Sequence, residues 1–430
     1  MQSQTLRLAG QDCADPGLWG RRARALLVVG VVVLALVPSV GVTGALAGSV
    51  VAVFPGDSIQ ALVNANPAGT TFLIKAGVHR RQQVTPKNDN SFVGESGAVL
   101  TGEDVTAYAF TGPAVRVTIR NLIVEHYDTP SSDAPIHCSS AGYWVVEDNE
   151  IRFNAHIGIG AGPRWVVRNN YIHHNGQLGM VGAGEDIAIE GNEIAFNNTG
   201  GHDPYWEAGG TKFVYTTNLV VRNNYVHDNA GPGLWTDINN INTLYEGNRV
   251  IGNDGPGIFH EISYDAVIRN NTVEGNGFGF TAWIDGAGIL VSSSPNVEIY
   301  GNTVRYNNDG IAAKHGTLDQ ADAKYGPWQL KNLWVHDNVI VMDAGQTGVV
   351  RDSNNSDPVW GPSWNNRFDY NTYTLDTGDD YYVWDPWIIT TAQWRAFGQD
   401  SNGTWTTVPP PLPPWADGPS LISFRSGTKP

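Results

Sequence analysis

A nine-residue pattern of apolar and polar positions recurs through the middle of this chain. It reads apolar, two polar residues, Asn, any residue, Ile or Val, two further residues, and Asn. The first Asn of successive copies is 21 to 24 residues from the next in four of seven intervals, and 31, 32 or 36 residues in the others. The copies are VEDNEIRFN (146–154), VRNNYIHHN (167–175), IEGNEIAFN (189–197), VRNNYVHDN (221–229), YEGNRVIGN (245–253), IRNNTVEGN (268–276), IYGNTVRYN (299–307) and a degraded VHDNVIVMD (335–343).

The pattern predicts stacked coils of short strands. Residues alternate around each Asn as they do in half-buried strands, and a Gly-led apolar triplet follows further on. No single copy could bury its own apolar face, and no helix-length amphipathic segment separates the copies, so neighbouring copies must stack. Three short strands per coil of about 22 residues, with coils ~4.8 Å apart, describe a parallel β-helix. We interpret the asparagines as an internal ladder without catalytic role, because an Asn amide can bond the coils above and below.

With this repeat the chain resembles the right-handed parallel β-helix superfamily, the pectate-lyase-like fold, over roughly residues 50–350. Residues 56–102, GDSIQALVNANPAGTTFLIKAGVHRRQQVTPKNDNSFVGESGAVLTG, are similar to the first part of such proteins. Ser58 suits the N-cap of a capping helix over 58–64, which has an apolar stripe to bury. The implied fold is all-β, a single right-handed parallel β-helix with an N-terminal capping helix and an irregular C-terminal segment. That fold hosts lyases, hydrolases, epimerases and binding proteins.

We expect three regions along the chain. Residues 1–47 form a signal peptide or membrane anchor, residues 48–350 the β-helix, and residues 351–430 an aromatic and proline-rich segment that packs on the last coils. The last region includes a short helical piece near Thr391–Phe397. Its proline-rich stretch at 408–419 is expected to be extended and to lie on the surface.

The N-terminal segment has the layout of an export signal. Arginines between residues 21 and 24 precede an apolar run, Ala25–Val37, that ends at a proline. Small residues at positions 45 and 47 suit a cleavage site, which would make Gly48 the first residue of the mature chain. An uncleaved anchor over residues 25–47 is the alternative, since the apolar run can extend to about 20 residues. In both cases the bulk of the chain is expected to be extracytoplasmic or secreted.

Cysteine content and charge limit the partners. Loss of residues 1–47 would remove Cys13 and leave Cys138, which we expect to be an inert buried thiol. The full chain carries −16 and residues 1–47 carry +2, so the mature part carries −18. Such an acidic protein repels nucleic acid, so we expect it to bind none. We further expect a monomer that contacts a membrane only through an uncleaved N-terminal segment. The chain has no Walker, Rossmann, zinc-finger or Ser-His-Asp signature, so we expect no nucleotide or protease role.

The Gly-led triplets bring two carboxylates together. Gly233 and Gly257 are 24 residues apart, and each has a carboxylate four positions later, Asp237 and Glu261. Strand alternation turns the position after each Gly toward the core, and the second and fourth positions outward. On neighbouring coils the two carboxyl groups should therefore project side by side, about 5 Å apart. That spacing matches retaining glycosidases, and two carboxylates so close should have one raised and one lowered pKa.

This pair also resembles the Asp and Glu on adjacent coils of β-helix glycoside hydrolases that act on xylosides and related sugars. The resemblance implies that Asp237 is the nucleophile and Glu261 the acid/base. Trp235 and Phe259 would then form a stacking wall for a sugar ring. Lys212, in the same outward column as the two aromatic residues, could neutralise Asp237.

Two of the long intervals flank this pair. The insertion NNTGGHDPYWEAGGTKF (197–213) comes just before the Asp237 coil, and GFGFTAWIDGAG (277–288) comes just after the Glu261 coil. Loops beside a rigid scaffold are where binding residues concentrate. The candidates for substrate binding in these loops are Trp206, Glu207, His202, Asp203, Trp283 and Asp285.

Simpler interpretations apply to the same residues. Asp237 and Glu261 could be solvated charges on the outside of a solenoid. His260 lies at an inward position, so a hydrogen-bonded core or turn histidine is the better interpretation than a catalytic base. Lys314 and His315 fit an ordinary structural role at least as well as a functional one.

Three functions remain open. The first is a secreted retaining glycoside hydrolase acting on a polysaccharide or oligosaccharide, with no metal or other cofactor. The second is a polysaccharide lyase or uronate epimerase of the same fold, in which Lys212 or Lys314 would be the base and Ca²⁺ could bind among the carboxylates. The third is an extracellular carbohydrate-binding protein without catalysis.

Overall fold

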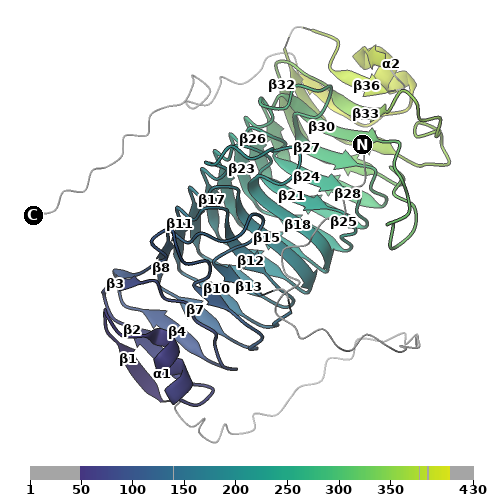
Figure 1. The fold of residues 1–430 in the computed structure, drawn as a ribbon. Coiled ribbons are helices and arrows are strands. Elements are labelled where there is room, and N and C mark those ends of the chain that lie inside the picture. The colour runs from purple at the N-terminus through teal and green to yellow at the C-terminus, as the bar shows by residue number, and fades with distance from the viewer. Residues whose placement is uncertain (1–48, 139, 377, 385–386, 407–430) are drawn as a thin grey trace, which may run out of the picture.

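The structure is a computed structural model that describes residues 49–138, 140–376, 378–384 and 387–406. The chain winds as one long solenoid, with helix α1 at the N-terminal end and helix α2 at the other (Figure 1). Within the described residues, three sheets of 13, 13 and 12 strands run along it, and each strand pairs with its equivalent in the next coil. The pairs are parallel except β36 with β37 in the last coil. The predicted all-β parallel β-helix is confirmed.

The strands of each sheet are short, as the repeat predicts. The first sheet holds β1 (Val50–Val53), β2 (Thr71–Ile74), β4 (Ser91–Gly94), β7 (Thr118–Arg120), β10 (Val145–Glu147), β13 (Val166–Arg168), β16 (Ala188–Glu190), β19 (Val220–Arg222), β22 (Thr243–Glu246), β25 (Ala266–Arg269), β28 (Val297–Tyr300), β31 (Trp334–His336) and β34 (Arg367–Asp369). The second holds β3 (Gly77–Arg80), β5 (Ala98–Thr101), β8 (Ile123–Glu125), β11 (Glu150–Arg152), β14 (Tyr171–His173), β17 (Glu193–Ala195), β20 (Tyr225–His227), β23 (Arg249–Ile251), β26 (Thr272–Glu274), β29 (Thr303–Arg305), β32 (Val339–Met342), β35 (Thr372–Leu375) and β38 (Thr404–Thr406). The third holds β6 (Phe110–Thr111), β9 (Ile136–His137), β12 (Ile157–Ala161), β15 (Leu178–Glu185), β18 (Gly209–Thr217), β21 (Leu234–Asp237), β24 (Ile258–Glu261), β27 (Ala287–Ser292), β30 (Asp309–His315), β33 (Thr347–Arg351), β36 (Tyr382–Trp384) and β37 (Trp387–Ile389).

The N-terminal end of the core is closed by the predicted helix. Helix α1 spans Ile59–Ala65, and the Ser58 side chain caps it by accepting a hydrogen bond from the Ala61 N–H. Ile59 and Val63 are buried in the same core as the first coils. The helix covers apolar edges that the first coil would otherwise leave open to water.

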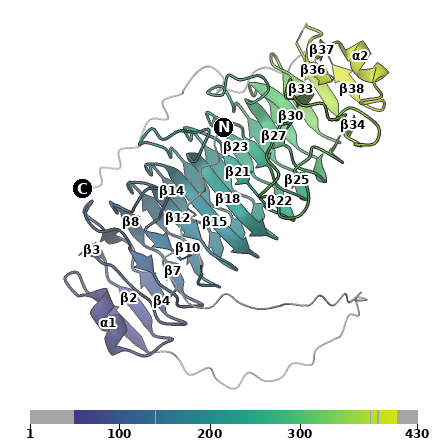
Figure 2. The same ribbon diagram turned by 45° about the vertical axis from the view of Figure 1, so that its right-hand side comes forward.

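The third sheet carries the Gly-led triplets. In Figure 2 the strands β15, β18 and β21 lie as successive rungs of this sheet. The residue after each leading Gly is buried in one continuous core, as alternation predicts: Ile159, Met180, Leu234, Ile258, Ile289 and Ile311. The residues one position further on form a separate apolar cluster on the outer side of the sheet. This parity determines which side chains are available to a ligand.

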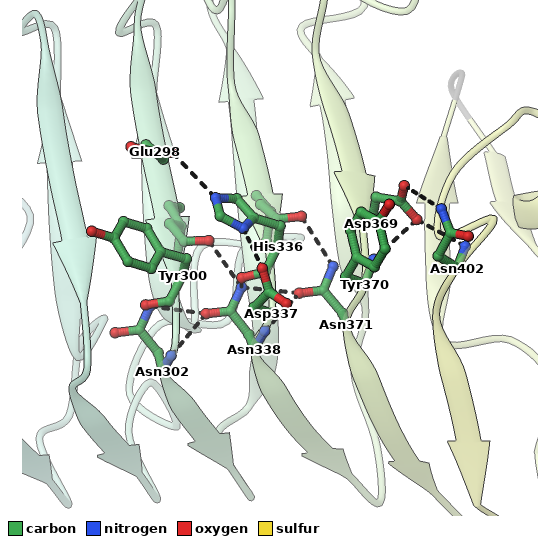
Figure 3. Close-up of polar contacts among 12 residues, drawn as sticks. Glu298, Tyr300, Asn302, His336, Asp337, Asn338, Asp369, Tyr370, Asn371 and Asn402 are labelled. Carbon is green, nitrogen blue, oxygen red and sulfur yellow. Dashed lines mark hydrogen bonds and ion pairs between the residues drawn. The ribbon is translucent and has the colours of Figure 1, made fainter.

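The asparagines form two internal ladders. In the coils drawn in Figure 3, the Asn302 amide donates to Oδ1 of Asn338 at 2.9 Å, and Asn338 donates to Oδ1 of Asn371 at 3.0 Å. The first Asn of each copy continues this ladder back to Asn149. The second Asn forms another ladder, from Asn154 to Asn307. Each amide satisfies backbone groups at a buried turn, so the predicted structural role is confirmed.

Removing one rung should destabilise the coil stack. Asn224 donates to the Ile189 carbonyl and to Asn248, and its oxygen accepts from Asn192. We expect Asn224→Leu to cost roughly 2–4 kcal/mol, because buried partners lose their hydrogen bonds. Thermal unfolding followed by circular dichroism measures the effect. The exposed neighbour Asn223, which has φ +57° and therefore tolerates glycine, supplies the control Asn223→Gly. Equal melting temperatures for the two variants would contradict the role of the ladder.

The β-helix continues beyond residue 350, where the sequence pattern was expected to end. Strands β34, β35, β36 and β38 extend all three sheets. Asn371 continues the ladder, and Asp400 takes the place of the next Asn by accepting from the Asn371 N–H and amide at 3.1 and 2.9 Å. The helical piece expected near Thr391–Phe397 is α2, Thr391–Ala396, which Thr390 and Gln393 cap reciprocally.

Two expectations concern residues that the structure does not describe. The signal or anchor at 1–47 and the proline-rich stretch at 408–419 lie outside the described residues. Among the residues that are described, no helix has both the length and the apolar character needed to cross a membrane. Cys138 is buried, as predicted.

Candidate active site

Asp237 and Glu261 are direct neighbours across two adjacent strands. Asp237 ends β21, Glu261 ends β24, and the register pairs one residue with the other. Equivalent positions on neighbouring strands are ~4.8 Å apart, and both side chains leave the sheet on its outer face. The same outward column continues to Ser292 and Lys314. The predicted side-by-side placement of the two carboxylates is therefore present in the structure.

The backbone just beyond the two carboxylates is strained. Ile238 has φ +52° and Ile262 has φ +35°, and a β-branched residue rarely adopts this conformation. The turn is held by Asn240, whose amide donates to the Asp237 carbonyl at 2.9 Å and to the Ser263 hydroxyl at 3.1 Å. Strain that is held in this way fixes the direction in which both carboxylates leave the sheet.

Lys212 is the counter-charge of Asp237. Its ammonium lies 2.9 Å from Oδ2 of Asp237, and 3.9 Å from the centre of the Trp235 ring. It also donates a hydrogen bond to the carbonyl of Trp206. Lys212 is 3% exposed and Asp237 9%, so this is a buried ion pair. The hypothesis that Lys212 neutralises Asp237 agrees with this geometry.

Glu261 holds its proton at neutral pH. The pKa of Glu261 is raised to about 8, and burial is the largest cause. The negative charge of Asp237 also raises this pKa, by more than the Lys212 ammonium lowers it. The Trp235 indole donates to Oε2 of Glu261 at 3.2 Å. A raised pKa for one of the two carboxylates was predicted, and it falls on the residue to which the acid/base role was given.

Trp235 and Phe259 do not form an open stacking wall. Their rings stack on each other with centroids 5.5 Å apart, and the two residues are only 2% and 9% exposed. Ile284, from the second insertion, belongs to the same outer apolar cluster, and Lys212 lies over Trp235. Strand alternation correctly predicted that Trp235 and Phe259 point outward. It could not predict that Ile284 and Lys212 would cover them. They form an apolar floor beneath the carboxylates.

The first insertion brings one aromatic candidate to the site. Trp206 is half exposed, and its ring centre lies 5.5 Å from the Lys212 ammonium. The other candidates make contacts within the loop or with an earlier coil. Glu207 accepts from the Ser132 hydroxyl, Asp203 from the Tyr205 N–H, and the His202 ring packs on His156. None of these contacts joins His202, Asp203 or Glu207 to the carboxylate pair.

The second insertion adds charge next to Glu261. Asp285 forms an ion pair with Lys314 at 3.1 Å, and its charge helps to raise the pKa of Glu261. Trp283 is 44% exposed, and its indole donates to Gln346, toward the later coils. The two insertions meet where Tyr205 packs on Phe280 with ring centroids 4.0 Å apart.

A third loop, residues 316–329, also reaches this site. The sequence pattern did not lead us to expect it there. Its backbone is bound by the Asn239 side chain, which donates to the Asp322 carbonyl and accepts from the Lys324 N–H. The Tyr264 hydroxyl donates to the Gly326 carbonyl at 2.6 Å. The signal was present in the sequence, because the longest repeat interval, 36 residues, contains this loop. The loop returns along the stack to the coils that carry Asp237 and Glu261.

His260 faces the core, as predicted, but it is only half hydrogen-bonded. Its Nδ1 lies 2.8 Å from the Thr236 hydroxyl, and its buried Nε2 has no partner among the described residues. Burial lowers the pKa of His260 to about 3, so the ring is neutral at physiological pH. The expectation of a fully hydrogen-bonded core histidine is therefore wrong for one nitrogen.

Breaking the Lys212–Asp237 pair should be costly. We expect Lys212→Met to destabilise the fold by about 3–5 kcal/mol, since it leaves a buried carboxylate without a partner. The double variant Lys212→Met/Asp237→Leu should recover most of this loss, because neither charge then remains. Lys314→Met, which breaks a more exposed pair, is the matched control and should cost at most about 1 kcal/mol. Chemical denaturation measures all three, and a double variant no more stable than Lys212→Met would contradict the assignment.

Comparisons with known proteins agree on the fold. The family model described as right handed beta helix region matches residues 88–203 and 134–304, which together span half of the chain. The AlgE6 and AlgE4 mannuronan C-5 epimerase A-modules of Azotobacter vinelandii superpose with TM-scores of 0.52 and 0.53 at 17% and 15% identity. These superpositions cover 82% and 85% of this chain and 94% and 96% of the epimerase chains.

A mannuronic acid specific polysaccharide family 6 lyase from human gut microbiota gives a TM-score of 0.57 at 12% identity, over 78% of this chain and 83% of the lyase. No curated protein matches the sequence. At these identities the structural matches establish the architecture. The chain belongs to the right-handed β-helix family.

Proposed function

We propose that this protein is a retaining glycoside hydrolase in which Asp237 is the nucleophile and Glu261 the general acid/base. The observation that carries the proposal is the adjacent pair itself, in which one carboxylate faces an ammonium and the other has its pKa raised to about 8. A separation of one strand spacing corresponds to the ~5–5.5 Å of retaining enzymes, and leaves no room for a water molecule between carboxylates.

The two residues divide the reaction as follows. Asp237 attacks the anomeric carbon and forms a glycosyl ester while the bond to the leaving oxygen breaks. Glu261 gives its proton to that oxygen, so the leaving sugar departs as a neutral alcohol. Glu261, now ionised, takes a proton from a water molecule that attacks the same carbon and releases Asp237. Each step inverts the configuration, so the product retains it.

Lys212 and Trp235 position the two carboxylates. The Lys212 ammonium lies against Asp237, and the Trp235 indole N–H donates to Glu261. Both therefore fix the rotamers of the reacting groups. Trp206 is half exposed and its ring contacts the Lys212 ammonium, and we assign it to the sugar bound at the pair.

A uronate lyase or epimerase is the second candidate. The observation that favours it is the set of structural matches, which are described as mannuronan epimerases and a mannuronic acid lyase. Such chemistry needs a base to remove a proton from the sugar ring. Lys212 is engaged with Asp237, Trp206 and Trp235, and Lys314 is paired with Asp285. In these contacts both lysines donate hydrogen bonds as ammonium groups, so neither offers the free lone pair that a base needs. This favours the hydrolase.

A substrate screen distinguishes the two enzymes and a binding protein. The chain without residues 1–47 is incubated with neutral polysaccharides and with alginate and pectate, with and without Ca²⁺, beside the Asp237→Asn variant. New reducing ends from a neutral glycan, absent with Asp237→Asn, support the hydrolase. Ultraviolet absorbance of an unsaturated uronate, or a changed uronate composition, supports the second candidate. Glycan binding without any product would assign the protein a binding role alone. We further propose that it acts outside the cytoplasm.

A further inference from the structure

The coil that carries Asp237 has one residue more than its neighbours, and this residue comes just after the carboxylate. In three neighbouring coils a single left-handed residue leads directly to a buried Thr or Ser: Tyr215–Thr216, Ile262–Ser263 and Ser293–Ser294. After Asp237 there are two left-handed residues, Ile238 with φ +52° and Asn239 with φ +59°, before the buried Asn240.

Hydrogen bonds identify Asn239 as the additional residue. The Asn240 amide oxygen accepts from the Thr216 N–H at 3.0 Å, and the Asn240 N–H donates to Oγ of Ser263 at 3.2 Å. These three residues therefore occupy equivalent positions in successive coils, and Asn239 has no counterpart in the described coil on either side. An extra residue of this kind bends the chain and re-aims the side chains beside it, here that of Asp237.

The additional residue uses its side chain to hold the third loop, residues 316–329. Asn239 is 2% exposed. Its amide nitrogen donates to the Asp322 carbonyl at 2.9 Å, and its amide oxygen accepts from the Lys324 N–H at 3.0 Å. Both hydrogen-bonding groups of one amide thus bind the backbone of a loop that comes more than 80 residues later. The loop is fastened two residues away from Asp237.

The third loop also covers the strained turn. Ile238 is 8% exposed and lies in an outer apolar cluster with Tyr264 and with Trp328, which the loop contributes. The Tyr264 hydroxyl fastens the loop a second time, at the Gly326 carbonyl. A left-handed β-branched residue persists only where its surroundings hold it. The loop holds this turn from outside, while Asn240 holds it from the core.

The turn determines where the Asp237 carboxylate lies. The Asp237 carbonyl accepts from the Asn240 amide at 2.9 Å, and Oδ2 of Asp237 lies 2.9 Å from the Lys212 ammonium. Side-chain direction follows the backbone, so a turn that relaxes would move this carboxylate relative to Lys212 and Glu261. A misplacement of about 1 Å at a reacting group can reduce the rate by about 10²-fold.

We propose that Asn239 is a positioning residue for Asp237, through which the third loop helps to aim the carboxylate. The inference rests on the proposed function, in which Asp237 is the nucleophile. Asn239 contacts no reacting atom and acts through the backbone of Ile238. The third loop would then contribute to the reaction without contributing a group that touches the sugar.

A pair of glycine variants tests this inference. Asn239→Gly removes only the amide, because glycine adopts φ +59° without strain. The matched control is Asn242→Gly in the same coil, which has φ +58° and an exposed side chain that bonds the exposed Asn218. With an activated aryl glycoside of the sugar that the substrate screen identifies, kcat of Asn239→Gly should fall roughly ten- to hundredfold. KM should stay within about twofold, since the amide does not bind substrate, and Asn242→Gly should keep both constants.

The Glu261 carboxyl provides a second readout that needs no turnover. The charge of Asp237 raises the pKa of Glu261, so a displaced Asp237 should lower that pKa in Asn239→Gly. Titration of ¹³C-labelled glutamate side chains by NMR measures the shift. Asn242→Gly should titrate as the unmodified protein does.

The results separate this inference from the proposed function. Unchanged kcat and an unchanged Glu261 titration in Asn239→Gly overturn the positioning role, even if the melting temperature falls. A higher KM with unchanged kcat also overturns it, because the loop would then be a wall for substrate. Equal losses in Asn242→Gly overturn it as well. If the substrate screen finds no turnover, the proposed function fails, and a Glu261 pKa lowered in Asn239→Gly alone still supports the coupling.

Discussion

Asp237→Ala should abolish glycoside turnover, by on the order of 10⁴-fold or more. The variant should also lose about 3–5 kcal/mol of stability, because the buried Lys212 ammonium is left without its partner, so its folding is checked by circular dichroism beside each assay. Removal of the nucleophile leaves no group that can form the glycosyl ester, while Glu261 can still protonate the leaving oxygen. Asp237 ends β21 with a 9% exposed side chain, and alanine removes its carboxylate. The volume of that carboxylate is then empty, next to the carbon it would have attacked. A small anion such as azide or formate can occupy that space.

Chemical rescue makes this prediction specific to a nucleophile. With an activated aryl glycoside, azide should restore turnover to Asp237→Ala and give a glycosyl azide of inverted configuration, since only one displacement then takes place. Asp343→Asn, an exposed carboxylate on a later coil, is the control and should keep full activity. Activity of Asp237→Ala near that of the unmodified protein would remove Asp237 from the mechanism.

Activity should fall as the pH rises through about 8, because Glu261 must be protonated to act as an acid and its pKa is raised to about 8. The charge of Asp237 raises this pKa, so Asp237→Asn should lower it. Titration of ¹³C-labelled glutamate side chains by NMR measures both proteins. A Glu261 signal that titrates near the ordinary value of 4.5 in the unmodified protein would contradict the assignment.

The same shift predicts how stability changes with pH. The folded state holds the Glu261 proton more tightly than the unfolded state, so stability falls as pH rises between about 4.5 and 8. Glu261→Gln has no proton to lose at this position. Its stability relative to the unmodified protein should therefore increase by about 2 kcal/mol from pH 4 to pH 9, less than the full shift implies because Glu261 is partly exposed. A difference that is constant with pH would contradict a raised pKa.

The fold could be predicted from the sequence because the repeat is strict. A nine-residue pattern with two asparagines determines the coil length, the strand parity and the ladder, and these together determine the pairing of Asp237 with Glu261. The end of the helix was harder to find. In the last coil Asp400 substitutes for an Asn, so the pattern fades while its hydrogen bonds persist.

The loops could not be predicted in the same way. Strand parity turned Trp235 outward correctly, but an inserted loop covers it, and no local pattern reports how a loop folds back over a sheet. The same holds for the loop of residues 316–329, whose length was visible and whose return to Asn239 was not. Side-chain direction follows from local periodicity, whereas exposure depends on contacts between distant coils.

The anomeric configuration of the first product tests the central claim most directly. ¹H NMR is recorded within the first minutes of hydrolysis of a glycan identified by the substrate screen, before mutarotation equilibrates the product. A product with the configuration of the substrate is the predicted result, because two displacements at one carbon, by Asp237 and then by water, restore it. A product of inverted configuration, or an unsaturated uronate, would contradict the assignment of Asp237 and Glu261 as nucleophile and acid/base.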